Sequence, residues 1–413
     1  MICGRATAPS GSICLPAEMT VATSVPAPTL PWQGLLPSEQ PHGAAPTPLA
    51  SRTLCTVLVL GAHGRLGYAC VQAFAQAGWR VLAHVCPGSG LVQHPCEAPP
   101  VAGEVRWVDT PLTDTAGWDQ LLASHGGVHV VVHAMATGFS SWAWARELEQ
   151  LTRSSIAVAR RCNALLLVPL SILAYGRQLP EVLREDDALP HAAMLGSSLA
   201  EGRAQTELQL RMAAETGLSV CTLRAGAYYG HAGDGWIRDA VAGQLPRGRM
   251  AWLGPYDVAT PWVYVHDLAQ TLERVASQRH RLGSWVRLHF AGQQRQGQDW
   301  WQALGQIALQ RGWVADAADL RSGHVPWPLW KLLGCFSPRI RALGAMEYVW
   351  RTPHRLDNRR LLALIGQEPR TDWQQSVAQT VELLFPTPVT PPMLAPAPLE
   401  LPAARPQQRV DAE

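Results

Sequence analysis

The chain has 413 residues, of which 47% are hydrophobic, so it is long enough to bury the core of one large or two smaller domains. Its formal net charge of +2 gives no reason to expect nucleic acid or an anionic surface as a partner. The nine cysteines are scattered and never spaced as CxxC, which argues against a disulfide framework or a zinc site and favours a reducing, cytoplasmic location.

The two ends of the chain differ in composition from its middle. Residues 1–52 are rich in Pro, Ala, Ser and Thr without hydrophobic periodicity, and residues 386–413 form a second Pro-rich segment. Both are predicted to be disordered, because such segments cannot bury enough apolar surface to fold. The first shows no continuous apolar stretch of a signal peptide, and no run reaches the ~18 apolar residues of a membrane span. We therefore expect a folded part over residues 53–385 and no membrane partner.

Apolar runs and helical patterns alternate along this part. Buried strands are predicted at residues 53–60, 79–86, 104–108, 128–136, 164–171 and 218–226, and helices at residues 65–78, 144–163 and 195–217. Gly78 and Gly217 stand at two of the predicted helix ends, where glycine commonly terminates a helix. The alternation predicts an α/β fold of the Rossmann type, with a doubly wound parallel sheet and a small C-terminal substrate domain.

A glycine-rich turn joins the first predicted strand to the first helix. Gly61, Gly64 and Gly67 form GxxGxxG in VLVLGAHGRLG. A dinucleotide requires a tight turn, close backbone approach to its phosphates and N–H groups at a helix start, and this context supplies all three. A Gly-rich turn without a ligand is the alternative. The loop residues predicted to bind the cofactor are Gly61, His63, Gly64, Arg65, Leu66 and Gly67.

The second strand bears on the choice between NAD and NADP. NAD recognition commonly uses an acidic residue at the end of this strand to bind the ribose 2′-OH, whereas His84 and Cys86 stand here. The missing carboxylate favours NADP slightly, but no Arg follows at the strand end. Arg65 is a candidate for a phosphate contact, with a solvated surface position as the commoner alternative. The predicted cofactor is NAD or NADP.

Further motifs follow in an order that resembles one family. The segments VVVHAMA (130–136), PLSILAYG (169–176), EDDALP (185–190) and TLRAGAYYG (222–230), together with the Gly motif, resemble the extended short-chain dehydrogenase/reductases, specifically their nucleotide-sugar epimerase/dehydratase branch. The resemblance spans about residues 55–385. It implies that Ala134 and Ala136 line the nicotinamide ribose, that Ser171 orients a substrate hydroxyl, and that Asp267 caps a helix.

The resemblance also implies a domain organisation and partners. Residues 53–224, continued by about 258–291, are predicted to form the NAD(P)-binding domain, and residues 225–257 and 292–385 the substrate-binding domain. The expected substrate is a small molecule such as a nucleotide sugar. The helix over residues 195–215 is of the type that pairs across a dimer interface in this family, so a homodimer is expected.

The sequence departs from the family at the catalytic pair. The family places a Tyr and, four residues later, a Lys on one helix, but alignment on Glu207 puts Leu199 and Arg203 there. No tyrosine of the chain has a lysine four residues on, because the only lysine is Lys331 and position 327 is Trp327. Arg203 is predicted to keep a positive charge near the ribose, although an arginine does not simply replace a lysine. Leu199 has no proton to give.

Three residues are candidate substitutes for the missing tyrosine: Tyr175, His191 and Tyr229. Packing under a loop is the commoner role for Tyr175, and solvation the commoner state of a loop histidine. For Tyr229 and its neighbour Tyr228, core packing and substrate contact are equally expected. The predicted catalytic residues are thus Ser171 and Arg203. The chain is either an epimerase/dehydratase-type protein with a degenerate site, acting on a sugar nucleotide or another hydroxyl or carbonyl substrate, or a non-catalytic redox sensor or assembly factor.

Aromatic residues crowd the C-terminal region. Core packing is predicted, rather than a stacking cleft, for Trp300, Trp301, Trp313, Trp327, Trp330, Trp350 and Trp373. The apolar segment VPWPLWKLLGCF (325–336) is predicted to be a buried helix, with contact to a membrane surface or a partner as the alternative.

Overall fold

The computed structural model describes residues 55–86, 103–136, 144–177, 179–190, 198–231 and 237–386. The predicted disorder of residues 1–52 and of the Pro-rich tail from 387 onward concerns segments outside these ranges, and His191 also lies outside them.

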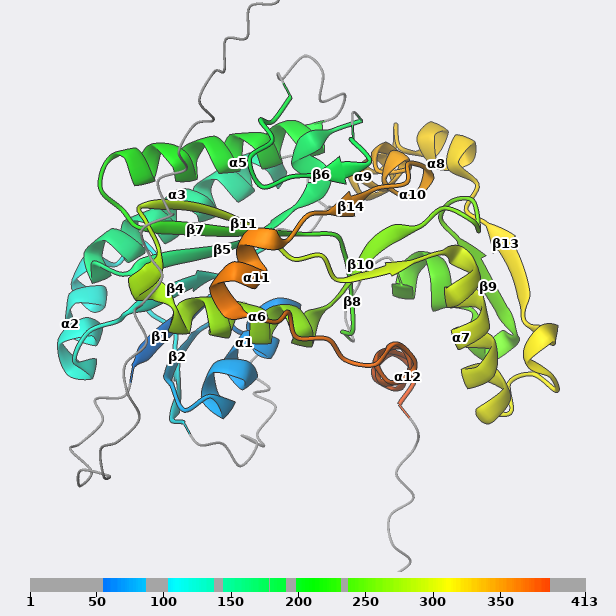
Figure 1. Ribbon diagram of the computed structural model, residues 1–413, viewed down its shortest axis with the longest axis horizontal. Helices are drawn as coiled ribbons and strands as arrows, with labels where there is room; N and C mark the ends of the chain where they lie inside the picture. The colour runs from blue at the N-terminus through cyan, green and yellow to red at the C-terminus, as the bar shows by residue number, and fades with distance from the viewer. Residues whose placement is uncertain are drawn as a thin grey trace, which may run out of the picture. The chain divides into compact units, whose positions relative to one another are not determined.

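A seven-stranded sheet forms the centre of the described part (Figure 1). Its strands are β1 (Thr56–Leu60), β2 (Arg80–His84), β3 (Val105–Val108), β4 (Val130–His133), β5 (Leu165–Ser171), β7 (Val220–Ala225) and β11 (Trp285–His289). Their order is β11-β7-β5-β4-β1-β2-β3, and each neighbouring pair is parallel. The chain adds strands on one side of β1 and then, from β4 on, on the other. The predicted doubly wound sheet is thereby confirmed.

Helices cover both faces of this sheet (Figure 1). One face carries α1 (Arg65–Gln76), α6 (Val265–Ser277) and α11 (Arg359–Ile365), and the other α2 (Thr115–His125), α3 (Trp144–Cys162) and α5 (Ser198–Glu215). The side chains of β1 alternate between these layers: Val57 and Val59 join the cluster with α1 and α6, whereas Leu58 and Leu60 join the cluster with α3 and α5. A strand that is buried on both faces must be apolar throughout, as this one is.

Local signals placed the C-terminal ends of the three helices with predicted bounds to within two residues. α1 ends just before Gly78 and α5 just before Gly217, and both glycines have the positive φ of a helix terminus, 84° and 95°. The helix α2 was not predicted, although Asp114 caps its start through Gly117 N. The prediction that Asp267 caps a helix is wrong: it lies within the first turn of α6, and its carboxylate accepts hydrogen bonds from Thr371 N and Oγ1 instead.

Smaller strands and helices build the rest of the described chain. The strands form three small sheets: β8 (Ala227–Tyr229) with β10 (Thr260–Tyr264) and β12 (Gln293–Arg295), β9 (Arg249–Trp252) with β13 (Arg321–His324), and β6 (Val182–Leu183) with β14 (Arg355–Leu356). The helices are α7 (Gly297–Gln310), α8 (Trp327–Leu333), α9 (Pro338–Ala345), α10 (Tyr348–Arg351) and α12 (Trp373–Leu384). Short 3-10 and π turns lie at Ile172–Tyr175 (η1), Ile237–Ala242 (η2), Leu245–Arg247 (η3), Arg279–Arg281 (η4) and Ala317–Asp319 (η5).

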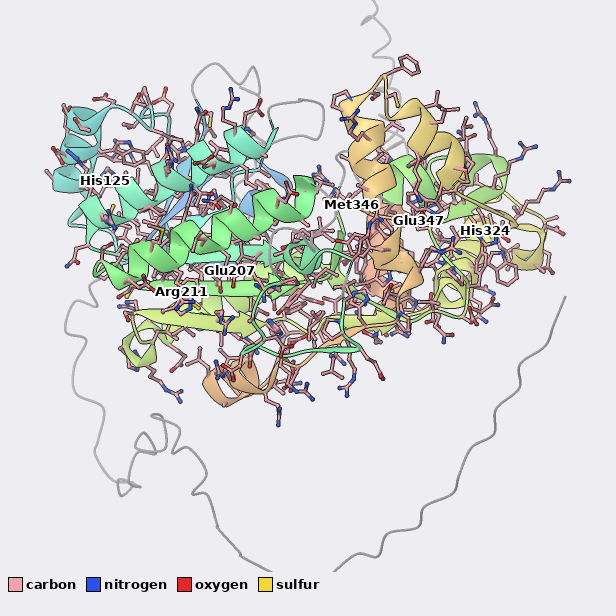
Figure 2. All side chains as sticks on the ribbon, turned by 90° about the horizontal axis from the view of Figure 1, so that it is seen from above. His125, Glu207, Arg211, His324, Met346 and Glu347 are labelled. Carbon is pink, nitrogen blue, oxygen red and sulfur yellow. The ribbon has the colours of Figure 1, made fainter. Side chains whose placement is uncertain are left out.

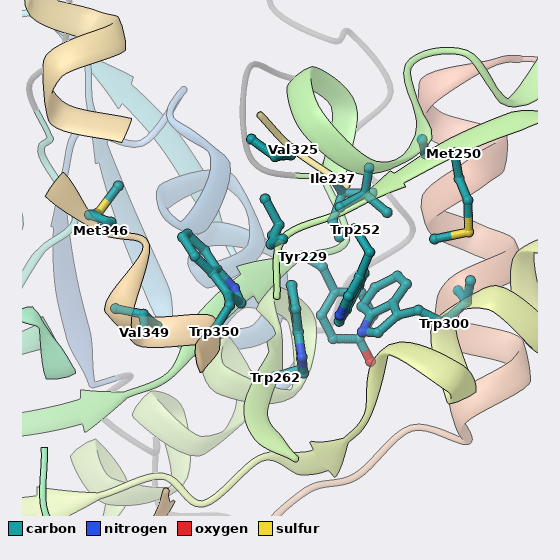
Figure 3. Packing of buried hydrophobic residues seen from close by; sticks show 14 of the residues in the cluster. Tyr229, Ile237, Met250, Trp252, Trp262, Trp300, Val325, Met346, Val349 and Trp350 are labelled. Atoms are coloured by element: carbon teal, nitrogen blue, oxygen red, sulfur yellow. The ribbon is translucent and has the colours of Figure 1, made fainter. Parts of the chain in front are cut away.

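An aromatic cluster forms the core of this region (Figure 3). Trp300 lies at its centre, with ring centroids 4.8 Å from Trp262, 4.8 Å from Trp373 and 5.3 Å from Tyr229, each in an edge-to-face arrangement. Such pairs stabilise beyond the area that they bury. The predicted core role of the tryptophans is confirmed: four are buried and three pack partly buried against the cluster, respectively Trp300, Trp327, Trp350 and Trp373, and Trp301, Trp313 and Trp330.

Candidate functional site

The carboxyl ends of three neighbouring strands bring several predicted site residues together. Gly61 follows β1, Ala134 follows β4, and Ser171 ends β5. The first two segments touch: Ala134 N donates to Leu60 O at 3.0 Å, and a Cβ built on Gly61 would lie 2.9 Å from the Cα of Met135. The edge of the sheet beside the strand-order reversal is where doubly wound folds bind ligands.

The glycine loop closes tightly on itself. A Cβ on Gly67 would lie 2.0 Å from the carbonyl oxygen of Gly61, and this oxygen also accepts a hydrogen bond from Gly64 N at 3.0 Å. Gly64 is the N-cap of α1, with no side-chain capping bond, and the first turn of α1 has no acidic residue. The positive end of the helix dipole is therefore not compensated by a carboxylate and suits an anion. The loop fits the pyrophosphate of a dinucleotide.

The other predicted loop residues differ in exposure. Leu66 is buried, His63 is half-buried, and Arg65 is exposed, with its Nη1 3.4 Å from Nε2 of His231, which follows β8. At the end of β2, His84 is buried with Nε2 2.9 Å from the carbonyl oxygen of Thr110, and burial lowers its pKa. The second strand thus ends in a histidine whose ring is held by the protein backbone.

Ser171 is placed by the turn that follows its strand. It is half-buried and caps the short helix η1, and its Oγ accepts a hydrogen bond from Leu173 N at 3.2 Å. Because the oxygen accepts this bond, the hydroxyl proton is left to donate to another oxygen. Ser171 can therefore orient a hydroxyl or carbonyl group at the end of β5.

The helix α5 presents Leu199 and Arg203 one turn apart. Leu199 is buried in the apolar core, whereas Arg203 is half-buried. Burial and, to a lesser extent, the nearby charge of Arg203 together lower the pKa of His133 to about 4. Burial raises the pKa of the Tyr228 phenol, while Arg203 opposes that rise. The guanidinium of Arg203 thus lies within electrostatic reach of both the end of β4 and β8.

His133 is the residue of this cluster that sequence reasoning missed. It is buried at the end of β4, and its Nδ1 lies 2.9 Å from Oγ of Ser155 on α3. The signal that could have found it is a polar residue that ends an otherwise apolar strand, at the edge where the Gly loop lies.

Two of the three candidate substitutes for the family's tyrosine, Tyr175 and Tyr229, lie in the core, and the third, His191, is outside the described residues. Tyr175 is buried, and its hydroxyl accepts a hydrogen bond from Arg224 Nη1 at 2.8 Å. Arg224 in turn forms a buried ion pair with Glu207, which lies on α5 (Figure 2). Tyr229 is fully buried, with its hydroxyl 2.8 Å from Oγ of Ser376, and burial raises its pKa. Both hydroxyls have protein partners, which favours packing for both residues.

Comparison with known proteins agrees with this geometry. Residues 57–284 match the model of the NAD dependent epimerase/dehydratase family. Three solved structures illustrate the likeness: the enzyme WbmH of Bordetella bronchiseptica in complex with NAD+ (17% identity, 80% and 98% of the two chains, TM-score 0.59), the UDP-glucose 4-epimerase of Brucella ovis in complex with NAD (14%, 79% and 97%, 0.57) and that of Thermotoga maritima with UDP-glucose (17%, 79% and 98%, 0.57). At these identities the structures share the fold. No curated protein matches the chain.

Proposed function

Because the chain belongs to the NAD-dependent epimerase/dehydratase family, we propose that the loop over residues 61–67 binds NAD or NADP beside a site for a nucleotide sugar or another hydroxyl or carbonyl substrate. The observation that carries the cofactor assignment is the contact between Gly67 and the carbonyl of Gly61, which leaves no room for a side chain, at a helix start without a side-chain cap. A turn that served packing alone would not need an uncompensated helix start.

Each residue has a role in this proposal. The backbone of Gly61, Gly64 and Gly67 holds the pyrophosphate, and Ala134 and Ala136, which follow β4, leave space for the nicotinamide ribose. Arg203 keeps a positive charge beside the ribose, and Ser171 donates a hydrogen bond to the substrate oxygen. The chemistry that a bound nicotinamide would supply here is hydride exchange at the substrate carbon. The fixed hydroxyl and the fixed cation position the reacting groups, which is a large part of what an active site supplies.

Proton transfer separates this site from an ordinary member of the family. A hydride exchange at a carbon needs a proton moved at the oxygen on that carbon, and Leu199 has none to move. A serine hydroxyl alone is a weak base. This favours a second candidate function, in which the chain binds the dinucleotide without turnover, as a redox sensor or an assembly factor.

The substrate class is proposed from the comparisons. The Thermotoga maritima structure contains UDP-glucose, and the fold that it shares with the present protein covers 79% of the present chain. We place the substrate on the side of residues 225–257 and 292–385. A homodimer through α5 is part of the same proposal, and Leu208 and Met212 on that helix are both exposed large apolar residues.

The first test is a titration of the full chain with NADH and with NADPH, read as energy transfer from tryptophan. The proposal requires saturable binding, and the tighter nucleotide identifies the cofactor. Turnover is then measured on a panel of UDP-sugars. Binding with turnover supports the enzyme, and binding without turnover supports the sensor. A folded chain that binds neither nucleotide would refute both.

The second test restores the family pair with Leu199→Tyr and Arg203→Lys together. New turnover in the double variant identifies a site that lost only its proton donor. A variant that stays folded and binds the nucleotide but gains no turnover favours the non-catalytic function. Leu199→Phe with Arg203→Lys is the matched control, because it adds an aromatic ring of similar size without a hydroxyl.

A further inference from the structure

The helix α8 is apolar on two opposite faces. One face packs on the core. Trp327 is buried, and its Nε1–H donates a hydrogen bond to Leu253 O at 2.9 Å. The half-buried Trp330 contacts Trp327, with the ring centroids 5.6 Å apart. The other face is exposed. The prediction of a buried helix for this segment is therefore correct for one face of α8 and wrong for the other.

The exposed face is a regular helical stripe that continues into the turn before α9. Its members follow each other at i, i+3, i+4 and i+7, the spacing of one side of a helix, and their exposed fractions are 49% for Leu329, 65% for Leu332, 39% for Leu333 and 84% for Phe336. We call these four residues the apolar hairpin face, because α8 packs against α9 as a helical hairpin. A short helix with apolar residues on both sides needs a second apolar neighbour besides the core.

The hairpin that carries this face is positively charged. Between Asp319 and Glu347 the chain has no acidic residue, and its basic residues there include Lys331 and Arg341. Lys331 is 54% exposed and pairs with Glu347, which lies beside Met346 where α9 gives way to α10 (Figure 2). Glu347 also accepts a hydrogen bond from Arg351, so two cations share this single carboxylate. The hairpin therefore carries a net positive charge.

A second copy of the chain is a poor fit for this face. At about 200 Å² for a fully exposed large side chain, the four exposed fractions provide less than about 500 Å², whereas a stable interface buries about 800 Å² on each partner. The residues that dominate binding at protein interfaces are also enriched in Trp, Tyr and Arg and depleted in Leu. Leucine and phenylalanine beside basic residues are instead typical of helices that lie in a bilayer interface.

We propose that the apolar hairpin face docks on a membrane surface that contains anionic lipids, with Phe336 and Leu332 inserted most deeply. The sequence-based expectation of no membrane partner rested on the lack of a spanning run, and it did not address contact with the surface. Within the described ranges, no helix is long and apolar enough to cross a bilayer. The docking would hold the chain at the lipid surface without anchoring it irreversibly.

The test is flotation of the full chain with vesicles, once of phosphatidylcholine alone and once with added phosphatidylglycerol. We expect binding to the anionic vesicles that weakens with salt, since the attraction of basic groups to the surface is screened. The double variant Leu332→Ser with Phe336→Ser should bind at least about tenfold more weakly, because each buried large apolar side chain contributes about that factor. Both positions are exposed, so the variant should keep the melting temperature and the nucleotide binding of the wild type.

The matched control is Leu383→Ser on α12, which replaces a leucine that is 43% exposed on another helix. It should bind vesicles like the wild type. The proposal is overturned if the wild type does not float with anionic vesicles, or if the hairpin variant and the control bind equally. It is also overturned if the hairpin variant converts a dimer into a monomer in the absence of lipid, because the face would then belong to a second copy.

Discussion

Replacement of Gly67 by alanine tests the cofactor site most directly. The added Cβ would lie 2.0 Å from the oxygen and 2.8 Å from the carbon of the Gly61 carbonyl, and 3.0 Å from the Cα of Ala62. All three atoms are backbone, so no side chain can rotate away. The loop and the start of α1 must separate by about 1.4 Å to restore an ordinary contact of 3.4 Å. A displacement of this size in a binding site can cost about 100-fold, so we expect the Kd for NADH to rise by about that factor.

Two further glycine-to-alanine variants test how the loss of NADH binding depends on the space around the added Cβ. A Cβ on Gly64 would lie 3.2 Å from the Gly61 oxygen, so Gly64→Ala should weaken binding less than Gly67→Ala. A Cβ on Gly283 would meet nothing within 4 Å, so Gly283→Ala should bind NADH like the wild type. The assay is the tryptophan energy-transfer titration, with circular dichroism as the check that each variant is folded. A folded Gly67→Ala protein that binds NADH within about threefold of the wild type would show that this loop does not hold the dinucleotide.

Three predictions concern stability. Arg224→Met should lower the free energy of unfolding, measured in urea titrations, by about 3–5 kcal/mol, because it leaves Glu207 charged and buried. Arg211→Ala, in the exposed pair with Glu215, should lower it by less than about 0.5 kcal/mol. Equal losses of stability in the two variants would contradict the prediction. Burial raises the pKa of Glu185 to about 7, so between the unfolded-state pKa and pH 7 the folded state holds a proton that the unfolded state releases. The wild type should therefore lose stability as the pH rises through this range, whereas Glu185→Gln should not. The stability of the variant relative to the wild type should be greater at pH 8 than at pH 5 by up to about 3 kcal/mol, and a constant difference would refute the argument. The pKa of His133 is lowered to about 4, so the unfolded state binds a proton at this residue before the folded state does as the pH falls below about 6.5. The wild type should then lose about 1.4 kcal/mol of stability for each pH unit down to about pH 4, and His133→Gln should lack this loss. An equal dependence of stability on pH in the variant and the wild type would show that His133 titrates normally.

Local sequence signals predicted six of the seven strands of the central sheet, without β11, and the C-terminal ends of three helices, because the physics behind these signals is local. A strand such as β1, buried on both sides, has to be apolar at every position, and a helix that ends in the left-handed region favours glycine, as Gly78 and Gly217 show. The helix α2 had comparable signals in Asp114 and Gly126, but few of its residues are buried, so no apolar stripe marked it.

Long-range contacts set the limits of the sequence-based predictions. Asp267 lies in a helix start that its carboxylate could have capped, yet it bonds to Thr371, 104 residues away. The grouping of His133, Arg203 and Tyr228 depends on where β4, α5 and β8 meet, and no spacing in the sequence reveals it. The sequence of α8 is apolar both on its buried face and on its exposed face. It therefore shows which side chains are apolar but not which of them the rest of the protein covers.

The bond between Tyr229 and Ser376 has a consequence for the order of biosynthesis. The two residues are 147 positions apart, and the family match already ends at residue 284. At a translation rate of about 5–20 residues per second, the ribosome needs roughly 7–30 s to deliver Ser376 after Tyr229 has been made. During that interval the tyrosine, and the tryptophans of the cluster that have already been synthesised, lack the α12 surface that buries them. Early release of the nascent chain would therefore expose an aromatic surface, and chaperones have their longest opportunity to bind before the last helix emerges.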